Sequence, residues 1–173
     1  MNICVIGATG KLGKALMQQP NTVECDVRFQ EADKYGQWFD KHPEVDTVWH
    51  VARACRQTGI RRDANTFMLE QDAMQKLLNT RANKCKFFYA STKVVYGITG
   101  DEVTPMSANQ TASAFTDNKK GTVNFPEWKT VDKVNISNLG TEHLIYAMTK
   151  LACEHLVSSK CNDYKIIRIW DII

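Results

Sequence analysis

The sequence has no hydrophobic run that is long enough to span a lipid bilayer. Its longest apolar stretches, Ile3 to Ile6 and the interrupted segment 166–173, fall far short of the roughly 20 residues that a membrane helix needs. The N-terminus also lacks a signal-peptide pattern, because Met1 and Asn2 lead straight into an apolar segment and a glycine turn. We therefore expect no membrane association and a cytoplasmic location.

A strong charge of either sign is also lacking. Lys and Arg total 22 against 19 Asp and Glu, a net charge of +3, and no dense basic block occurs beyond residues 59–62. This balance argues against a nucleic-acid-binding surface. With 43% hydrophobic and 24% charged residues, the composition excludes a disordered or fibrous chain, and 173 residues are enough for one domain, 1–173.

Cysteine pairs with redox or metal spacing are absent. No two of the six cysteines form a C-x-x-C motif, and they are spread over positions 4, 25, 55, 85, 153 and 161. Cys4 and Cys25 fall in predicted strands, where a reduced cysteine behaves as a small apolar side chain. The four histidines show no metal-ligand spacing either. We expect reduced thiols and no metal site.

Short apolar segments alternate with amphipathic ones along most of the chain. This pattern predicts a doubly wound α/β domain of Rossmann type with a mostly parallel sheet. The expected strands are 1–6, 22–27, 47–51, 86–90 and 165–169, and the expected helices are 11–19, 30–41, 65–80 and 142–160. From 98 to 139 the pattern lapses into a long excursion, which we interpret as an insertion or a substrate-side lid.

A glycine-rich turn follows the first predicted strand and opens the first predicted helix. In such a turn the first glycine permits the tight bend, the second lets the backbone approach a pyrophosphate, and the third lets helix and strand pack closely. The alternative is a glycine turn without a ligand. The segment reads Gly7-Ala8-Thr9-Gly10-Lys11-Leu12-Gly13.

The acidic residue expected after this turn comes early. A ribose-binding acid usually lies about 20 residues beyond the glycines, whereas Asp26 follows Gly13 by 13 positions. We expect Asp26 and Val27 to meet the adenine edge instead of the ribose. Arg28 either faces a 2′-phosphate or is an ordinary exposed arginine, so NAD and NADP both stay open as cofactors.

Two further elements carry candidate chemistry. Tyr146 and Lys150 are spaced i, i+4 on one helix face, and an ammonium close to a tyrosine hydroxyl favours the phenolate, which makes a general base. Ser91 and Thr92 follow a strand at the end where parallel sheets bind ligands. The alternatives are an ordinary amphipathic helix and a pair of hydroxyls that cap the next turn.

Four motifs in this order resemble the extended short-chain dehydrogenase/reductases, in particular the NAD-dependent epimerase/dehydratase family. The resemblance covers residues 1–169. Within the family, the chain is most similar to the nucleotide-sugar 4-ketoreductase branch. Besides the glycine turn, the motifs are Val48-Trp49-His50-Val51-Ala52, Tyr89-Ala90-Ser91-Thr92-Lys93-Val94-Val95-Tyr96-Gly97 and Tyr146-Ala147-Met148-Thr149-Lys150.

The resemblance implies an NAD(P)-dependent oxidoreductase or epimerase that acts on a nucleotide sugar. Thr92 would hydrogen-bond the substrate, Tyr146 would be the general acid/base, and Lys150 would hold the nicotinamide ribose. The implied cofactor contacts are Gly10, Lys11 and Leu12 at the pyrophosphate, Asp26 and Val27 at the adenine, and Val51, Ala52 and Arg53 at the central part of the cofactor.

Some positions depart from the family pattern. Arg53 stands where alanine is usual, and Glu70 replaces a helix asparagine. The chain stops just after segment 165–169, where the family builds its substrate domain. A second interpretation is therefore a cofactor-binding module without independent catalysis, either half of a split enzyme or a dinucleotide sensor. The expected partners are a second copy bound through helix 142–160, or a chain that supplies the substrate domain.

Overall fold

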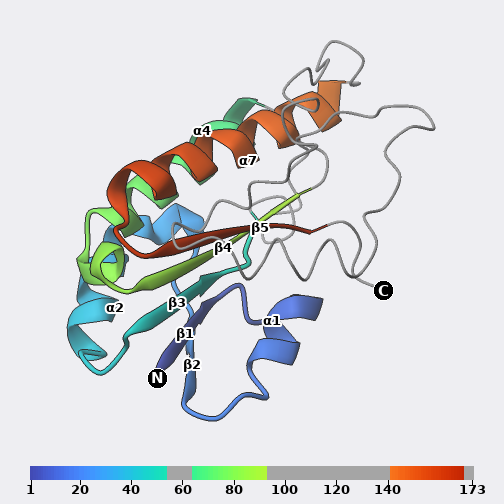
Figure 1. The fold of residues 1–173 in the computed structure, drawn as a ribbon. Coiled ribbons are helices and arrows are strands. Elements are labelled where there is room, and N and C mark those ends of the chain that lie inside the picture. The colour runs from blue at the N-terminus through green and yellow to red at the C-terminus, as the bar shows by residue number, and fades with distance from the viewer. Residues whose placement is uncertain (54–63, 93–140, 170–173) are drawn as a thin grey trace.

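The computed structural model describes residues 1–53, 64–92 and 141–169 (Figure 1). Its centre is a five-stranded sheet in the order β2-β1-β3-β4-β5, with every neighbouring pair parallel. The strands are β1 (Ile3–Ile6), β2 (Thr22–Cys25), β3 (Thr47–His50), β4 (Lys86–Thr92) and β5 (Tyr164–Ile169). This confirms the Rossmann-like α/β fold.

The strand order places a reversal next to β1. The chain moves outward from β1 to β2 and then returns to add β3, β4 and β5 on the other side. Open parallel sheets bind ligands at the carboxyl ends of the strands, at the point where the order reverses. All five strands end at one sheet edge, so the carboxyl ends of β1, β2, β3 and β4 share that edge.

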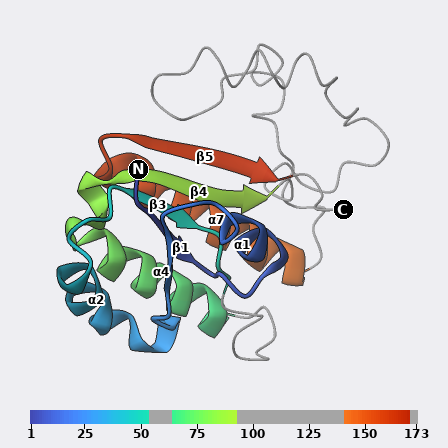
Figure 2. The same ribbon diagram turned by 90° about the horizontal axis from the view of Figure 1, so that it is seen from below.

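Helices cover the sheet unequally. Figures 1 and 2 show α4 and α7 side by side on one face with α2 beside them, whereas α1 lies on the other face. The helical segments are α1 (Lys11–Leu16), η1 (Phe29–Lys34), α2 (Tyr35–Lys41), α4 (Ala64–Leu78), η2 (Arg81–Lys84) and α7 (Thr141–Lys160). The predicted strand-helix alternation is confirmed for these residues.

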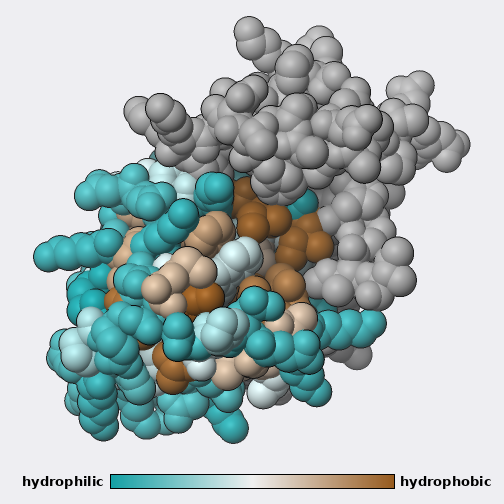
Figure 3. Space-filling view, turned by 60° about the horizontal axis from the view of Figure 1, so that its bottom comes forward, coloured by the Kyte–Doolittle hydropathy of each residue, from teal (hydrophilic) through white to brown (hydrophobic). Residues whose placement is uncertain are grey.

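The larger core lies under α2, α4 and α7, where Val48 and Phe87 meet Leu77 and Val157, all with fully buried side chains. A smaller cluster under α1 contains Ile3, Val5 and Ala8. On that second face the rings of Trp49 and Phe88 stack with centroids 4.2 Å apart. Figure 3 shows this side of the molecule, with apolar surface between hydrophilic side chains.

Two predicted helices differ from the observed ones. Segment 30–41 is not one helix: η1 is interrupted at Glu31, which has non-helical dihedrals (φ −112°, ψ 22°), and α2 begins at Tyr35. The first helix ends at Leu16 and not at residue 19, because the amides of Gln18 and Gln19 bond three residues back and tighten the chain into a turn. The excursion 98–139 lies outside the described residues.

The thiols are free and buried at each of the five described cysteines; Cys55 lies outside the described residues. The Cys25 thiol beside Cys4 raises the pKa of Cys4, with burial as the second cause. Burial raises the pKa of Cys153 to about 11. These thiols therefore act as small core side chains. No helix in the described parts of the chain has the length and apolar character to cross a bilayer.

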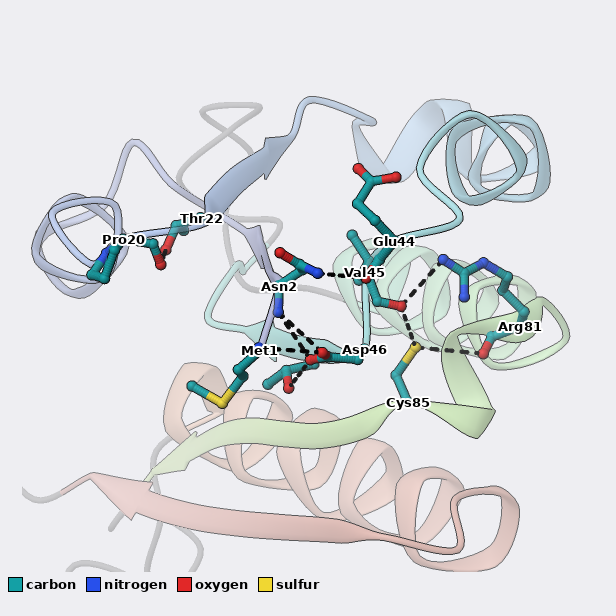
Figure 4. Close-up of polar contacts among 10 residues, drawn as sticks. Met1, Asn2, Pro20, Thr22, Glu44, Val45, Asp46, Arg81 and Cys85 are labelled. Carbon is teal, nitrogen blue, oxygen red and sulfur yellow. Dashed lines mark hydrogen bonds and ion pairs between the residues drawn. The ribbon is translucent and has the colours of Figure 1, made fainter.

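Polar contacts tie the opposite, amino-terminal edge of the sheet together (Figure 4). The backbone amide of Asn2 donates to both oxygens of Asp46 at 3.1 Å. The Arg81 guanidinium donates to the backbone carbonyls of Phe39 and Val45 at 3.2 Å and also to that of His42. These contacts fasten the amino-terminal edge, whereas ligands bind parallel sheets at the opposite, carboxyl edge.

Candidate functional site

The glycine turn after β1 needs two of its glycines for packing. Gly7 has a φ of +97°, and a Cβ there would lie 2.6 Å from the backbone nitrogen of Ala52. A Cβ on Gly13 would lie 2.1 Å from the carbonyl oxygen of Gly7. Both distances are far too short for a real side chain. The close contact of α1, the turn and the segment after β3 therefore explains these two glycines.

Packing among the described residues does not require a glycine at position 10. Its φ of −74° is ordinary for any residue, and a Cβ there would meet just the Gly7 carbonyl oxygen at 3.5 Å, a normal contact distance. Gly10 is the N-cap of α1, and no side chain caps the helix start. The free amides of a helix start attract anionic groups, so a glycine here leaves room for a group from outside the chain.

The predicted adenine and central-cofactor residues lie at the same edge. Asp26 and Val27 directly follow β2, with Asp26 exposed and Val27 buried. After β3, the Val51 amide donates to the Ile6 carbonyl at 2.9 Å, which holds the segment from Val51 through the buried Ala52 to Arg53 against the end of β1. The ends of three adjacent strands thus bring these residues beside the glycine turn.

The predicted catalytic residues gather where α7 packs on β4. Thr92 is the last residue of β4 and is 7% exposed. The Lys150 ammonium is buried and donates to the Ala90 carbonyl at 3.3 Å. It lies 4.9 Å from the centroid of the Tyr89 ring and 6.0 Å from that of Tyr146. The structure therefore brings Lys150 and Tyr146 together at the end of β4.

A buried carboxylate lies one helical turn beyond Lys150. Glu154 accepts hydrogen bonds from the Ser91 hydroxyl and from the guanidinium of Arg168 on β5. The sequence interpretation missed this cluster. Its signal was available in part, because Glu154 continues the spacing of four residues that runs through Tyr146 and Lys150. Its pairing with Arg168 depends on the tertiary structure.

His50 ends β3 inside the core. Its ring stacks on Phe29 at 5.9 Å and lies 5.6 Å from the ring of Tyr89. Burial, helped by the positive charge of Lys150, lowers the pKa of His50 to about 3. Its Nδ1 has no hydrogen-bond partner among the described residues. A neutral imidazole in this position is a core side chain.

The candidate residues thus form two groups along one edge. The first surrounds the ends of β1, β2 and β3, and the second lies at the end of β4 under α7. Since neighbouring strands are about 4.8 Å apart, the ends of β1 and β4 are separated by roughly 10 Å. An elongated ligand would be needed to contact both groups at once.

Neither a protein-family model nor a curated protein sequence matches this chain. Solved structures do match its fold. RMD from Pseudomonas aeruginosa, complexed with NADPH, has a TM-score of 0.60 at 20% identity, with 99% of this chain and 54% of that chain covered. The dTDP-4-dehydrorhamnose reductase from Bacillus anthracis, in complex with NADP, has a TM-score of 0.58 at 18% identity over 98% and 54%.

A third match is the dTDP-glucose 4,6-dehydratase from Bacillus anthracis in complex with NAD, with a TM-score of 0.58 at 12% identity over 97% of this chain and 54% of that chain. This chain spans about half the length of these neighbours. They are NAD(P)-dependent enzymes of the epimerase/dehydratase and short-chain dehydrogenase type. The chain has the fold that its motif resemblance implied, shared with nucleotide-sugar reductases and dehydratases.

Proposed function

We propose that this chain binds NAD or NADP along the carboxyl edge of its sheet and transfers hydride to or from a nucleotide sugar, in a reduction or an epimerisation. The observation that carries the proposal is Gly10 at the start of α1, a glycine that packing among the described residues does not require. Neighbours of the same fold have been solved with NADP and NADPH, which supports a dinucleotide as the ligand.

The residues of the first group fit the adenine half of such a cofactor. The backbone amides of the first turn of α1 would hold the pyrophosphate, and Asp26 and Val27 at the end of β2 would contact the adenine. The segment after β3 would contact the middle of the molecule. The full proposed contact set is Gly7, Thr9, Gly10, Lys11, Leu12, Gly13, Asp26, Val27, Val51, Ala52 and Arg53, with Tyr146 and Lys150 at the nicotinamide end.

The second group fits the chemistry at the nicotinamide end. A bound nicotinamide supplies or accepts hydride. Thr92 would hydrogen-bond the reacting oxygen of the sugar, and the Tyr146 hydroxyl would donate or accept the proton at that oxygen. Lys150 would bind the nicotinamide ribose beside Tyr146. The approach of Lys150 to the Tyr146 ring supports these roles.

Turnover by a variant of Tyr146 tests this proposal. Oxidation of NADPH in the presence of a dTDP-4-dehydro sugar is followed by absorbance, and Tyr146→Phe should lower kcat by about 10²-fold or more, since the variant loses general acid catalysis. Tyr164→Phe, at the start of β5 and away from the proposed site, is the matched control and should keep wild-type turnover. Equal turnover by Tyr146→Phe and wild type would contradict the catalytic assignment.

A second candidate is a cofactor-binding module without independent catalysis. About half of each neighbour has no counterpart in this chain. A partner chain would then supply the substrate-binding part. Turnover by the purified chain alone would exclude this candidate, whereas cofactor binding without turnover, followed by turnover once a partner chain is added, would support it.

We also propose a homodimer through α4 and α7 and a location in the cytoplasm. These two helices lie side by side (Figure 1), and each carries an exposed methionine, Met68 at 64% and Met148 at 46% exposure. Sedimentation equilibrium of wild type and of Met148→Glu tests the dimer. The dimer proposal is wrong if both proteins sediment as monomers. Cell fractionation tests the location.

A further inference from the structure

The Glu154 carboxylate is held from two strands at once. Arg168 of β5 binds it with two nitrogens, Nε to Oε1 at 2.9 Å and Nη2 to Oε2 at 2.6 Å. Ser91 of β4 donates its hydroxyl proton to Oε1. Ser91 and Arg168 face each other in the β4–β5 register, and Glu154 is 6% exposed. Both carboxylate oxygens are therefore occupied below the end of β4.

Lys150 is the natural competitor for this carboxylate. It precedes Glu154 by four residues on α7, a spacing that brings side chains together on a helix surface and normally favours an ion pair. Lys150 instead donates to the Ala90 carbonyl and makes no ion pair with a described carboxylate. Its ammonium thus stays at the end of β4, over the ring of Tyr89.

Other ionisable groups surround Lys150. His50 of β3 is close enough for the lysine charge to help lower the pKa of that histidine. Glu70 of α4 and Glu154 each help raise the pKa of Tyr89, after burial as the first cause. The acidic groups in this region are thus Glu70 on α4 and Glu154 on α7. Arg168 binds Glu154, which is the one spaced to pair with Lys150.

We propose that Arg168 is a positioning residue: by holding the Glu154 carboxylate, it keeps the Lys150 ammonium free at the end of β4 for the nicotinamide ribose. This inference rests on the proposed function for the identity of the ligand. The positions of Lys150, Glu154 and Arg168 do not depend on it. A buried carboxylate is strongly disfavoured without a cation. Without Arg168, Lys150 would turn toward Glu154 and leave the Ala90 carbonyl.

The position of Lys150 has a spectroscopic signature. Protons above the face of an aromatic ring resonate upfield, so the side-chain methylene protons next to the Lys150 ammonium should be shifted upfield by the Tyr89 ring. The signal is assigned by its loss in Lys150→Met. In Arg168→Gln we expect this upfield shift to be lost, because Lys150 turns away from the Tyr89 ring toward Glu154. In the double variant Arg168→Gln/Glu154→Gln, which has no carboxylate to compete, the upfield shift should return.

Binding of NADPH gives the second readout. Arg168→Gln should weaken binding by about tenfold, the effect of losing one charged hydrogen bond, and the double variant should recover most of that loss. Lys160→Gln is the matched control on the same helix, because Lys160 bonds the surface residue Asn79. It should change neither readout. A merely structural role for Arg168 predicts no recovery in the double variant.

Unchanged Lys150 signals in Arg168→Gln, or a double variant that does not restore them, would overturn the inference. If Arg168→Gln does not fold, Arg168→Lys carries the test, because one ammonium cannot hold both carboxylate oxygens as the guanidinium does. A partial loss of the upfield shift is then expected, and no change would overturn it. If wild type binds no form of NAD or NADP, the proposed function fails, while the Lys150 signal still decides the role of Arg168.

Discussion

Gly10 and Gly13 are glycines for different reasons, although they belong to one turn. A side chain at 13 would collide with the backbone of Gly7 and Ala8, whereas a side chain at 10 would find ordinary contact distances. The first position serves the packing of α1 on β1. The second serves no contact in the part of the chain that the structure describes, which is why it points to a ligand.

Alanine substitution separates the two reasons. Gly13→Ala should lower the free energy of unfolding by about 3 kcal/mol, because a methyl group is forced into backbone atoms. Gly10→Ala should change it by less than about 1 kcal/mol, since its dihedrals suit alanine. Urea unfolding of both variants gives the comparison. Equal destabilisation would show that Gly10 is also required for packing.

His50 should make the protein sensitive to acid. Its pKa is about 3 in the folded chain against an ordinary 6.5, so the unfolded chain binds the proton more tightly. The stability contributed by the neutral imidazole is present above the unfolded pKa and is lost as the pH falls from 6.5 toward 3. Between pH 7 and pH 5 this loss amounts to about 2 kcal/mol.

Comparison with His50→Leu isolates this effect from the carboxylates that also titrate in acid. Urea unfolding of the two proteins at pH 7 and pH 5 should show that wild type loses about 2 kcal/mol more than the variant. The same loss in both proteins would mean that His50 takes up a proton within the fold.

At the scale of elements, contacts near in sequence are the ones that the sequence predicts. The glycine turn and the spacing of Tyr146 and Lys150 are local patterns, and each is placed as expected, at the end of β1 and on α7. The pairing of Glu154 with Arg168 requires β5 to lie beside β4 in one register. No local pattern contains that register, so this cluster was missed.

Helix ends show the same difference between local patterns, which the sequence predicts, and other features, which it does not. The period of the apolar residues predicts helices over 11–19 and 30–41, but the break at Glu31 and the tight turn after Leu16 arise from backbone dihedrals that periodicity does not encode. The short segment η2 was not predicted either. Its Arg81 reaches carbonyls around 40 positions earlier in the chain, which is a tertiary contact.

Arg81 should be the main link between η2 and the end of α2. Its guanidinium donates to three backbone carbonyls, those of Phe39, His42 and Val45. Arg81→Ala should lower the free energy of unfolding by about 2–3 kcal/mol, because these carbonyls lose a charged donor. In urea unfolding, the exposed neighbour Lys84→Ala should stay within about 0.5 kcal/mol of wild type, and a similarly small effect at Arg81 would refute the link.

At the scale of the whole molecule, the fold aligns two groups of residues that are far apart in sequence. The turn after β1 and the Lys150 region of α7 come to one edge because every strand of the sheet is parallel. The match to solved nucleotide-sugar reductases and dehydratases confirms the predicted parallel α/β fold that produces this shared edge. The chain covers about half the length of those enzymes. Cofactor binding can be measured on this chain separately from turnover.

Calorimetric titration of the full 173-residue chain with NAD⁺, NADP⁺ and their reduced forms tests the central claim most directly. We predict saturable binding of at least one form, weakened about tenfold or more in Gly10→Ala, where a methyl group occupies the space left for the pyrophosphate. Absence of binding by all four forms at millimolar concentration, or equal binding by wild type and Gly10→Ala, would contradict the assignment of this edge as a dinucleotide site.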